Sequence, residues 1–191
     1  MAILKVARLG HPVLREKARE LTLSDMGSPE IGRLVSDMID TMDEYDGIGL
    51  AAPQVHQPVR LAVLGFEDDS PRYPGMGKQD LLVLINPVVT VLDPTLQGFW
   101  EGCLSVPGLK GLVYRPRKVR IDFMDLQARK RSIEAEDFLS TVFQHELDHL
   151  DGVVFLDRVQ GGPGERPIAF TDEYERYHLP DEDSDVGELD D

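Results

Sequence analysis

Two histidines four residues apart lie late in the chain, in the stretch Gln144–Gly152 (QHELDHLDG). On a helix, residues at this spacing are neighbours, so His145 and His149 could present ring nitrogens to one metal ion. Glu146 would lie beside that ion, where a carboxylate can accept a proton from a water molecule. The stretch therefore predicts metal-dependent hydrolysis. The alternative is a buried helix whose two histidines are hydrogen-bonded in the core.

A catalytic ion needs a third protein ligand. The familiar peptidase pattern continues to a third histidine, but that position is Phe155 here. Glu165 and Glu173 lie further along, in a Gly/Pro-rich and an acidic segment. Cys103 is the stronger candidate, because it follows a run of strand-like segments and its thiolate would complete a set of one cysteine and two histidines. Alone, a single cysteine more often fills a core.

Two helices are expected to frame these groups. Ser28 can cap a helix with Pro29 at its first position, and we expect Gly47 to end it. A second helix is predicted from about Phe138 to Leu150, with Gly152 as its cap. This second helix is apolar on two sides, which predicts that it is buried.

Short β-like runs separate the two helices. They cover residues 60–66, 81–85, 88–92 and 118–124, and a polar loop occupies 67–80. Val119, Ile121 and Phe123 alternate with polar residues, as in a half-buried antiparallel strand. The order of elements predicts an α+β fold: a single domain with antiparallel sheets packed around the buried, histidine-bearing helix, plus an N-terminal helix.

The charge of the chain limits its partners. Its 191 residues carry 20 basic and 35 acidic side chains, a net charge of −15, which disfavours binding to nucleic acid or to an anionic membrane. Residues 181–191 hold seven acids and no base, and we expect them to form a disordered tail. With one cysteine and no long apolar run, the chain is expected to be cytoplasmic.

Three segments together resemble peptide deformylases of the bacterial or organellar type. They are Gly47–Gln54 (GIGLAAPQ), Glu101–Ser105 (EGCLS) and Gln144–Gly152, in the family's order and approximate spacing. The resemblance covers most of residues 4–158. It implies a catalytic domain at 1–160, which leaves 161–191 as a C-terminal extension that ends in the acidic tail.

The resemblance also implies an activity. Family members remove the formyl group from the N-formylmethionine of newly synthesised polypeptides and release formate. The native ion would be Fe²⁺, although Zn²⁺ or Ni²⁺ could be present in purified protein. Action at the ribosome exit stays open, because the acidic tail lacks the basic helical ending of some members.

Carried over by position, the resemblance assigns roles to individual residues. The metal ligands are Cys103, His145 and His149. Glu146 becomes the general base and acid, with a metal-bound water as the nucleophile. The Gln54 amide and the Leu104 N–H become donors to the negative oxygen of the transition state. Without the other motifs, Gln54 would be interpreted as a loop amide.

Substrate contacts follow from the same resemblance. Ile48 and Gly49 would pair with the substrate main chain as an added strand, and Gly102 could do the same. Alone, these glycines would indicate only a turn. The pocket for the methionine side chain is assigned to Ile48, Phe99, Phe138, Thr141 and Val142. For the residues on the helix, ordinary core packing is the alternative.

Arg115 and Asp148 are candidates for orienting the histidines, with a plain surface ion pair as the alternative. Two other functions compete with the deformylase interpretation. A metallopeptidase is disfavoured because Phe155 replaces the third histidine. A noncatalytic metal-binding module is disfavoured because it would need neither Glu146 nor Gln54.

Overall fold

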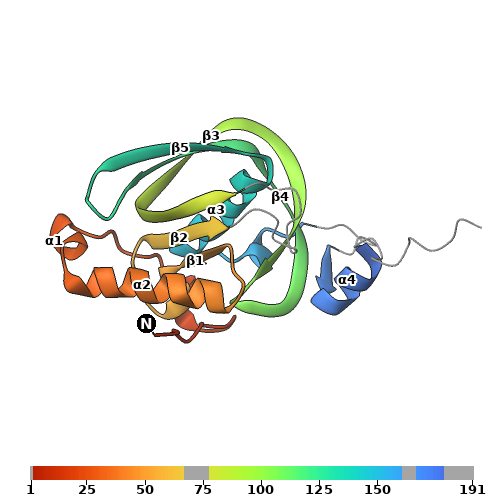
Figure 1. The fold of residues 1–191 in the computed structure, drawn as a ribbon. Helices are drawn as coiled ribbons and strands as arrows, with labels where there is room; N and C mark the ends of the chain where they lie inside the picture. Colours follow the sequence, from red (N-terminus) through yellow and green to blue (C-terminus); the bar gives the residue numbers. More distant parts are fainter. Residues whose placement is uncertain (1, 67–77, 161–166, 179–191) are drawn as a thin grey trace, which may run out of the picture.

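A six-stranded antiparallel sheet forms the centre of the computed structural model, which describes residues 2–66, 78–160 and 167–178 (Figure 1). The strands are β1 (Gly49–Ala51), β2 (Leu61–Phe66), β3 (Gln79–Cys103), β4 (Val106–Met124), β5 (Lys130–Glu136) and β6 (Ile168–Phe170). They follow the order β1-β2-β3-β4-β5, and β6 pairs with β4. Together with the helices, this arrangement confirms the expected α+β class.

Helices and single turns surround the sheet. The α-helices are α1 (Leu23–Met26), α2 (Pro29–Glu44), α3 (Asp137–Leu150) and α4 (Thr171–His178). The 3₁₀ turns are η1 (Pro12–Arg15), η2 (Ala52–Val55) and η3 (Phe155–Asp157). No helix in the described part of the chain is both long and apolar enough to cross a membrane.

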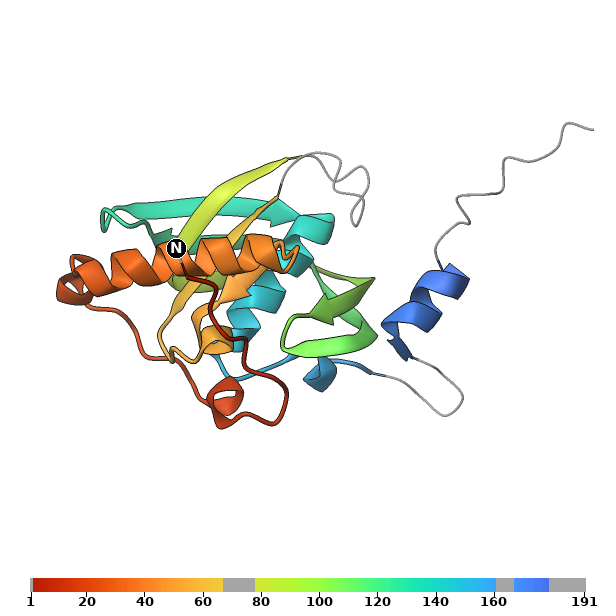
Figure 2. The same cartoon turned by 60° about the horizontal axis from the view of Figure 1, so that its bottom comes forward.

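Strand β2 lies between the two long helices (Figure 2). Leu61 and Val63 belong to the core cluster that α2 completes, whereas Ala62 and Leu64 belong to the cluster that α3 completes. Successive side chains of a strand point to opposite faces, so both faces of β2 are buried. This explains why the run is continuously apolar rather than alternating.

Helix α2 begins as predicted and ends earlier. The Ser28 hydroxyl accepts a hydrogen bond from the Ile31 N–H at 3.3 Å, and Pro29 occupies the first turn. The helix ends at Glu44, so the expectation that Gly47 ends it was wrong. The Gly47 N–H instead donates back to the Met42 carbonyl at 2.9 Å and turns the chain towards β1.

The long hairpin of β3 and β4 differs from the short runs that the sequence suggested. The runs at 81–85 and 88–92 belong to one strand, and the register shift between Ile85 and Val88 marks their junction. Asn86 lies there with φ of 49°, next to Pro87. The hairpin turns between Cys103 and Val106, so the cysteine lies at the end of the pair.

Parts of the C-terminal region extend the fold. Strand β6 was not predicted, and it pairs with β4 through Leu109, Lys110 and Gly111. Helix α4 follows β6 directly and lies beside this end of the hairpin (Figure 1). The acidic segment 181–191 and most of the predicted loop at 67–80 lie outside the described residues.

Helix α3 matches its predicted span within one residue. It is buried along most of its length and packs against β4 and β1. Gly152, with φ of 74°, follows the end of the helix as predicted, and its N–H donates to the His149 carbonyl at 3.3 Å. A side chain at position 152 would meet the Arg15 carbonyl oxygen at 2.7 Å. The position therefore needs glycine both for its backbone angle and for its close contact with Arg15.

Candidate metal centre

The sheet and helix α3 bring together one cysteine and two histidines. Cys103 lies at the end of β3, and His145 and His149 lie one turn apart on α3. One ligand atom from each residue lies within 4.8 Å of the others. The Cys103 Sγ is 3.3 Å from the His149 Nε2, and the two imidazole rings meet at 81°. The ligand atoms are therefore close enough to share one ion.

The protonation of the cysteine suits a metal. Desolvation raises the pKa of the Cys103 thiol, but attraction to His149 and hydrogen bonds from both imidazoles outweigh it, so the pKa lies well below its ordinary value. Thiolate is the form of cysteine that binds metal ions. A soft thiolate with two imidazoles suits zinc, iron or nickel better than calcium or magnesium.

Glu101 fixes the orientation of His145. Its Oε2 lies 2.7 Å from the His145 Nδ1. The pKa of Glu101 is lowered to about 2, because hydrogen bonds from His145 and Arg115 outweigh the opposing effect of desolvation. An ionised carboxylate can only accept, so Nδ1 carries the proton and Nε2 is left for an ion. Sequence reasoning missed this residue.

Arg115 and Asp148 extend this network, and the pair is buried rather than on the surface. Arg115 donates to both Glu101 oxygens, at 2.6 and 3.0 Å, and to the Asp148 Oδ2 at 2.8 Å. Arg158 binds the same aspartate at 2.5 Å. Asp148 thus acts on His145 through Arg115 and Glu101. Arg158 is a second residue that the sequence did not indicate.

Glu146 is buried beside the two histidines, and no described residue binds its Oε2. Desolvation raises the pKa of this carboxyl, and attraction to His145 and His149 offsets the rise only in part. Gly49 on β1 lies directly against it: a Cβ at that position would come within 2.6 Å of the glutamate side chain. The glycine gives Glu146 the space that it occupies.

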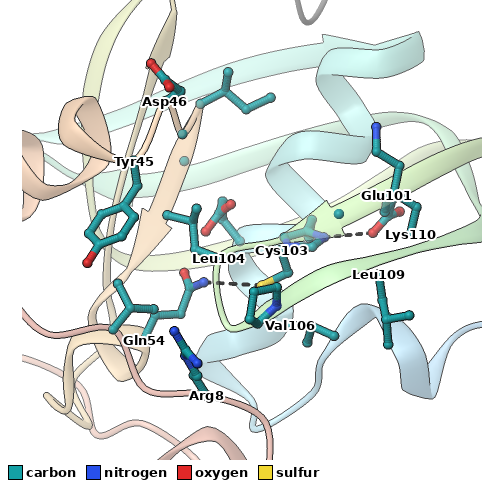
Figure 3. Close-up of a pocket in the computed structure, with 18 of the residues that line it drawn as sticks. Arg8, Tyr45, Asp46, Gln54, Glu101, Cys103, Leu104, Val106, Leu109 and Lys110 are labelled. Carbon is teal, nitrogen blue, oxygen red and sulfur yellow. Dashed lines mark hydrogen bonds and ion pairs between the residues drawn. The ribbon is translucent and has the colours of Figure 1, made fainter. Parts of the chain in front are cut away.

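Gln54 points its amide nitrogen at the cysteine (Figure 3). Its Oε1 accepts a hydrogen bond from the Ala51 N–H at 2.8 Å, which leaves the NH₂ group directed inward. The Nε2 lies 3.4 Å from the Cys103 Sγ and 3.3 Å from the Ser105 Oγ. Leu104 occupies the hairpin turn next to the cysteine. Both residues line the same cavity.

That cavity has a volume of about 840 Å³ and opens next to the ligand cluster. Most of the predicted substrate residues line it: Ile48, Gly49, Gly102, Phe138, Thr141 and Val142. Phe99 is not among the lining residues. Its ring contacts Phe138 edge-on at 5.4 Å, so its predicted contact with substrate stays a prediction.

Of the two glutamates considered as a third ligand, Glu173 is not in the cluster. Glu173 lies on α4 and forms an ion pair with Arg176. Glu165 falls outside the described residues. Phe155, at the position of the missing third histidine, stacks against His145 with ring centroids 6.1 Å apart.

A family model described as polypeptide deformylase matches residues 3–162. The chain belongs to the peptide deformylase family. Members of this family are hydrolases that remove the N-formyl group from nascent peptides, and they depend on a metal ion. The matched region contains the three candidate ligands, Glu146 and Gln54.

Named deformylases resemble the chain over most of their length. A peptide deformylase of Leptospira biflexa is 41% identical over 160 residues, which cover 84% of this chain and 89% of that protein. A peptide deformylase from a Picosynechococcus species is 43% identical over 157 residues, which cover 82% of this chain and 79% of that protein.

Solved deformylase structures share the fold. A class I type b peptide deformylase from Acinetobacter baumannii, bound to Met-Ala-Ser, has a TM-score of 0.79 and 32% identity, with 83% of this chain and 99% of that chain covered. A Synechococcus elongatus peptide deformylase in complex with actinonin has a TM-score of 0.73 and 37% identity, and the match covers 84% of this chain and 81% of that chain.

Beyond the deformylase match, the C-terminal segment reaches the cavity. Thr171, at the start of α4, is one of the lining residues. Tyr174 places its ring 5.0 Å from Trp100, and the Lys110 ammonium lies 4.5 Å from the centre of the same ring. Trp100 and Lys110 also line the cavity. Thr171 thus contributes to the cavity wall from outside the family match, and Tyr174 packs against two other lining residues.

Proposed function

We propose that this deformylase hydrolyses N-formylmethionyl peptides at an ion held by Cys103, His145 and His149. The observation that supports this most strongly is the meeting of one thiolate and two imidazoles next to a buried carboxyl with an unbound oxygen. When bound, the ion would activate a water molecule and polarise the formyl carbonyl. The protein groups around the ion would transfer the proton, bind the developing negative charge and position the peptide.

Glu146 is proposed as the group that moves the proton. Burial raises the pKa of this carboxyl towards neutral pH, and a general acid–base group is most effective when its pKa lies near the working pH. The unbound Oε2 is available to accept a proton from water and to deliver it to the leaving amine. Gly49 keeps space for this exchange.

Gln54 and Leu104 are proposed to hold the oxygen that becomes negative in the transition state. The Ala51 N–H fixes the Gln54 amide before substrate arrives, so no reorganisation is needed during the reaction. The Leu104 N–H comes from the hairpin turn next to Cys103. Donors fixed in this way favour the developing charge over the neutral formamide.

The peptide substrate is proposed to bind as an extra strand. β1 ends the sheet order, so Ile48 and Gly49 lie at an edge that can pair with a peptide main chain. Gly102 lines the cavity from β3. The Met-Ala-Ser in the Acinetobacter baumannii structure supports a peptide that begins with methionine.

Iron is proposed as the native ion. A thiolate and two imidazoles also bind zinc, because affinity within the divalent series does not favour iron. Fe²⁺ expands its coordination more readily than tetrahedral Zn²⁺, which suits a reaction that must hold both water and carbonyl.

We assign catalysis to residues 1–160 and place it in the compartment that contains the ribosomes, since nascent peptides are the substrate.

Formate release from formyl-Met-Ala-Ser by anaerobically purified protein tests the proposal. Glu146→Gln should keep the metal and lower the rate about 10²- to 10⁴-fold, because it removes proton transfer but no ligand. Metal analysis accompanies each assay. Loss of the ion together with activity would make Glu146 structural. Cleavage of unformylated Met-Ala-Ser without formate release from the formyl peptide would favour a metallopeptidase.

A further inference from the structure

Thr141 leaves a buried hydroxyl without a partner in the wall of the cavity. The residue lies on α3, one turn before His145, and is 2% exposed. Among the residues that the structure describes, none forms a hydrogen bond with its Oγ1. Burying a hydroxyl without a hydrogen bond is unfavourable. In a well-packed helix, such a group needs an explanation.

The helix backbone does not satisfy this hydroxyl. A threonine within a helix can donate to the carbonyl four residues earlier, which for Thr141 belongs to Asp137. That carbonyl accepts instead from the Gln97 Nε2 at 2.6 Å. The neighbouring Ser140 shows the contrast, because its hydroxyl donates to the Pro116 carbonyl at 2.9 Å.

The surroundings of Thr141 in the cavity are largely apolar. Phe138 and Val142 line the cavity from the same helix, and Ile48 lines it from the segment before β1. Glu146 also has an unpartnered oxygen there, but the proposed proton transfer accounts for it. The Thr141 hydroxyl has no part in that chemistry, so its partner is expected to come from a bound molecule.

We infer that the Thr141 hydroxyl donates a hydrogen bond to the thioether sulfur of the substrate's methionine, and so selects methionine over a hydrocarbon side chain of the same shape. The inference rests on the proposed function. A thioether sulfur is a weak acceptor. Norleucine has a methylene group in its place, so its binding would leave the hydroxyl buried and unpaired.

Turnover of a matched pair of substrates tests the inference. The metal-loaded protein should favour formyl-Met-Ala-Ser over formyl-norleucyl-Ala-Ser by about three- to tenfold in kcat/KM, as one neutral hydrogen bond allows. Thr141→Val should bring the ratio close to one. Thr141→Ser, which keeps the hydroxyl, should retain the preference. The change should appear in KM, because the contact forms when substrate binds.

Melting temperature provides a second measurement on the same variants. Valine removes an unpaired hydroxyl from the free protein, so Thr141→Val should melt at the wild-type temperature or a few degrees higher. A clear drop would show that the hydroxyl already has a partner and would overturn the inference. A substrate ratio that Thr141→Val leaves unchanged would also overturn it, with the proposed function intact. Failure of the wild type to hydrolyse either peptide would overturn both.

Discussion

Glu101 lies with its Oε2 2.7 Å from the His145 Nδ1, and the same carboxylate binds Arg115 through both oxygens. This contact sets which ring nitrogen of His145 is free for an ion. Replacing Glu101 with glutamine removes the charge and lets the side chain present an NH₂ group to the imidazole. We expect Glu101→Gln to lower metal affinity about 10- to 100-fold. Competition with a chelator measures the change.

Glu134→Gln is the matched control for that experiment. Glu134 lies on β5, pairs with Lys118 at the surface, and belongs neither to the cavity lining nor to the candidate ligand cluster. The Glu134→Gln variant should keep wild-type metal affinity. Equal retention of metal in Glu101→Gln and in the wild type would show that Glu101 does not orient His145.

Arg115 and Arg117 allow a comparison of a buried and an exposed ion pair on one strand. The Arg115 side chain is 3% exposed and binds two buried carboxylates, whereas Arg117 is 47% exposed and pairs with Glu136 and Asp137. Arg115→Met should lower the free energy of unfolding by about 3–5 kcal/mol, because it leaves buried charges uncompensated. Arg117→Met should cost less than about 1 kcal/mol. Urea unfolding curves measure both, and similar costs would contradict this account.

Gly49→Ala should reduce activity more than stability. The added Cβ would come within 2.6 Å of the Glu146 side chain, which must then leave its position, while the metal ligands stay in place. Formate release should fall by at least about tenfold, because a small displacement of a catalytic group is costly. Metal content should not change.

Gly32→Ala provides the control for adding a methyl group to a glycine. Nothing lies within 4 Å of a Cβ at this position on α2. Activity should be unchanged, and the free energy of unfolding should rise by about 0.5–1 kcal/mol, because alanine favours a helix. Full activity in Gly49→Ala would mean that Glu146 can work from a shifted position.

The identity of the ion can be tested by loading apoprotein anaerobically with one metal at a time. Iron and nickel forms should release formate from formyl-Met peptides faster than a zinc form. In air, the iron form should decay while the nickel form persists, because oxygen attacks both Fe²⁺ and its thiolate ligand Cys103. Rates are followed before and after aeration. Equal, air-stable rates with iron and zinc would reject iron.

The sequence predicts the parts of the site that depend on local spacing. His145 and His149 are four apart on one helix, so their proximity follows from helical geometry. Glu101 is 44 residues from His145 and reaches it only because the sheet packs on α3. One local signal was available: Glu101 and Cys103 are two apart on a strand and therefore lie on the same face.

Strand lengths were harder to predict than helices. The runs at 81–85 and 88–92 were predicted as separate segments, but β3 continues through both of them with a register shift between Ile85 and Val88. β5 has the sequence KRSIEAE, in which charged side chains outnumber apolar ones. Such a composition suits an outer strand of the sheet, where solvent and ion pairs accommodate charge, yet it gives little apolar periodicity.

Cys103 and His149 touch in space but are 46 residues apart along the chain. During synthesis, the thiol therefore appears well before the second imidazole is added. The full set of proposed ligands can form only after α3 has packed against the β3–β4 hairpin. Only a fully folded chain can therefore bind the ion, because a truncated or misfolded copy lacks the complete set of proposed ligands. Catalysis can therefore begin only after the chain has folded.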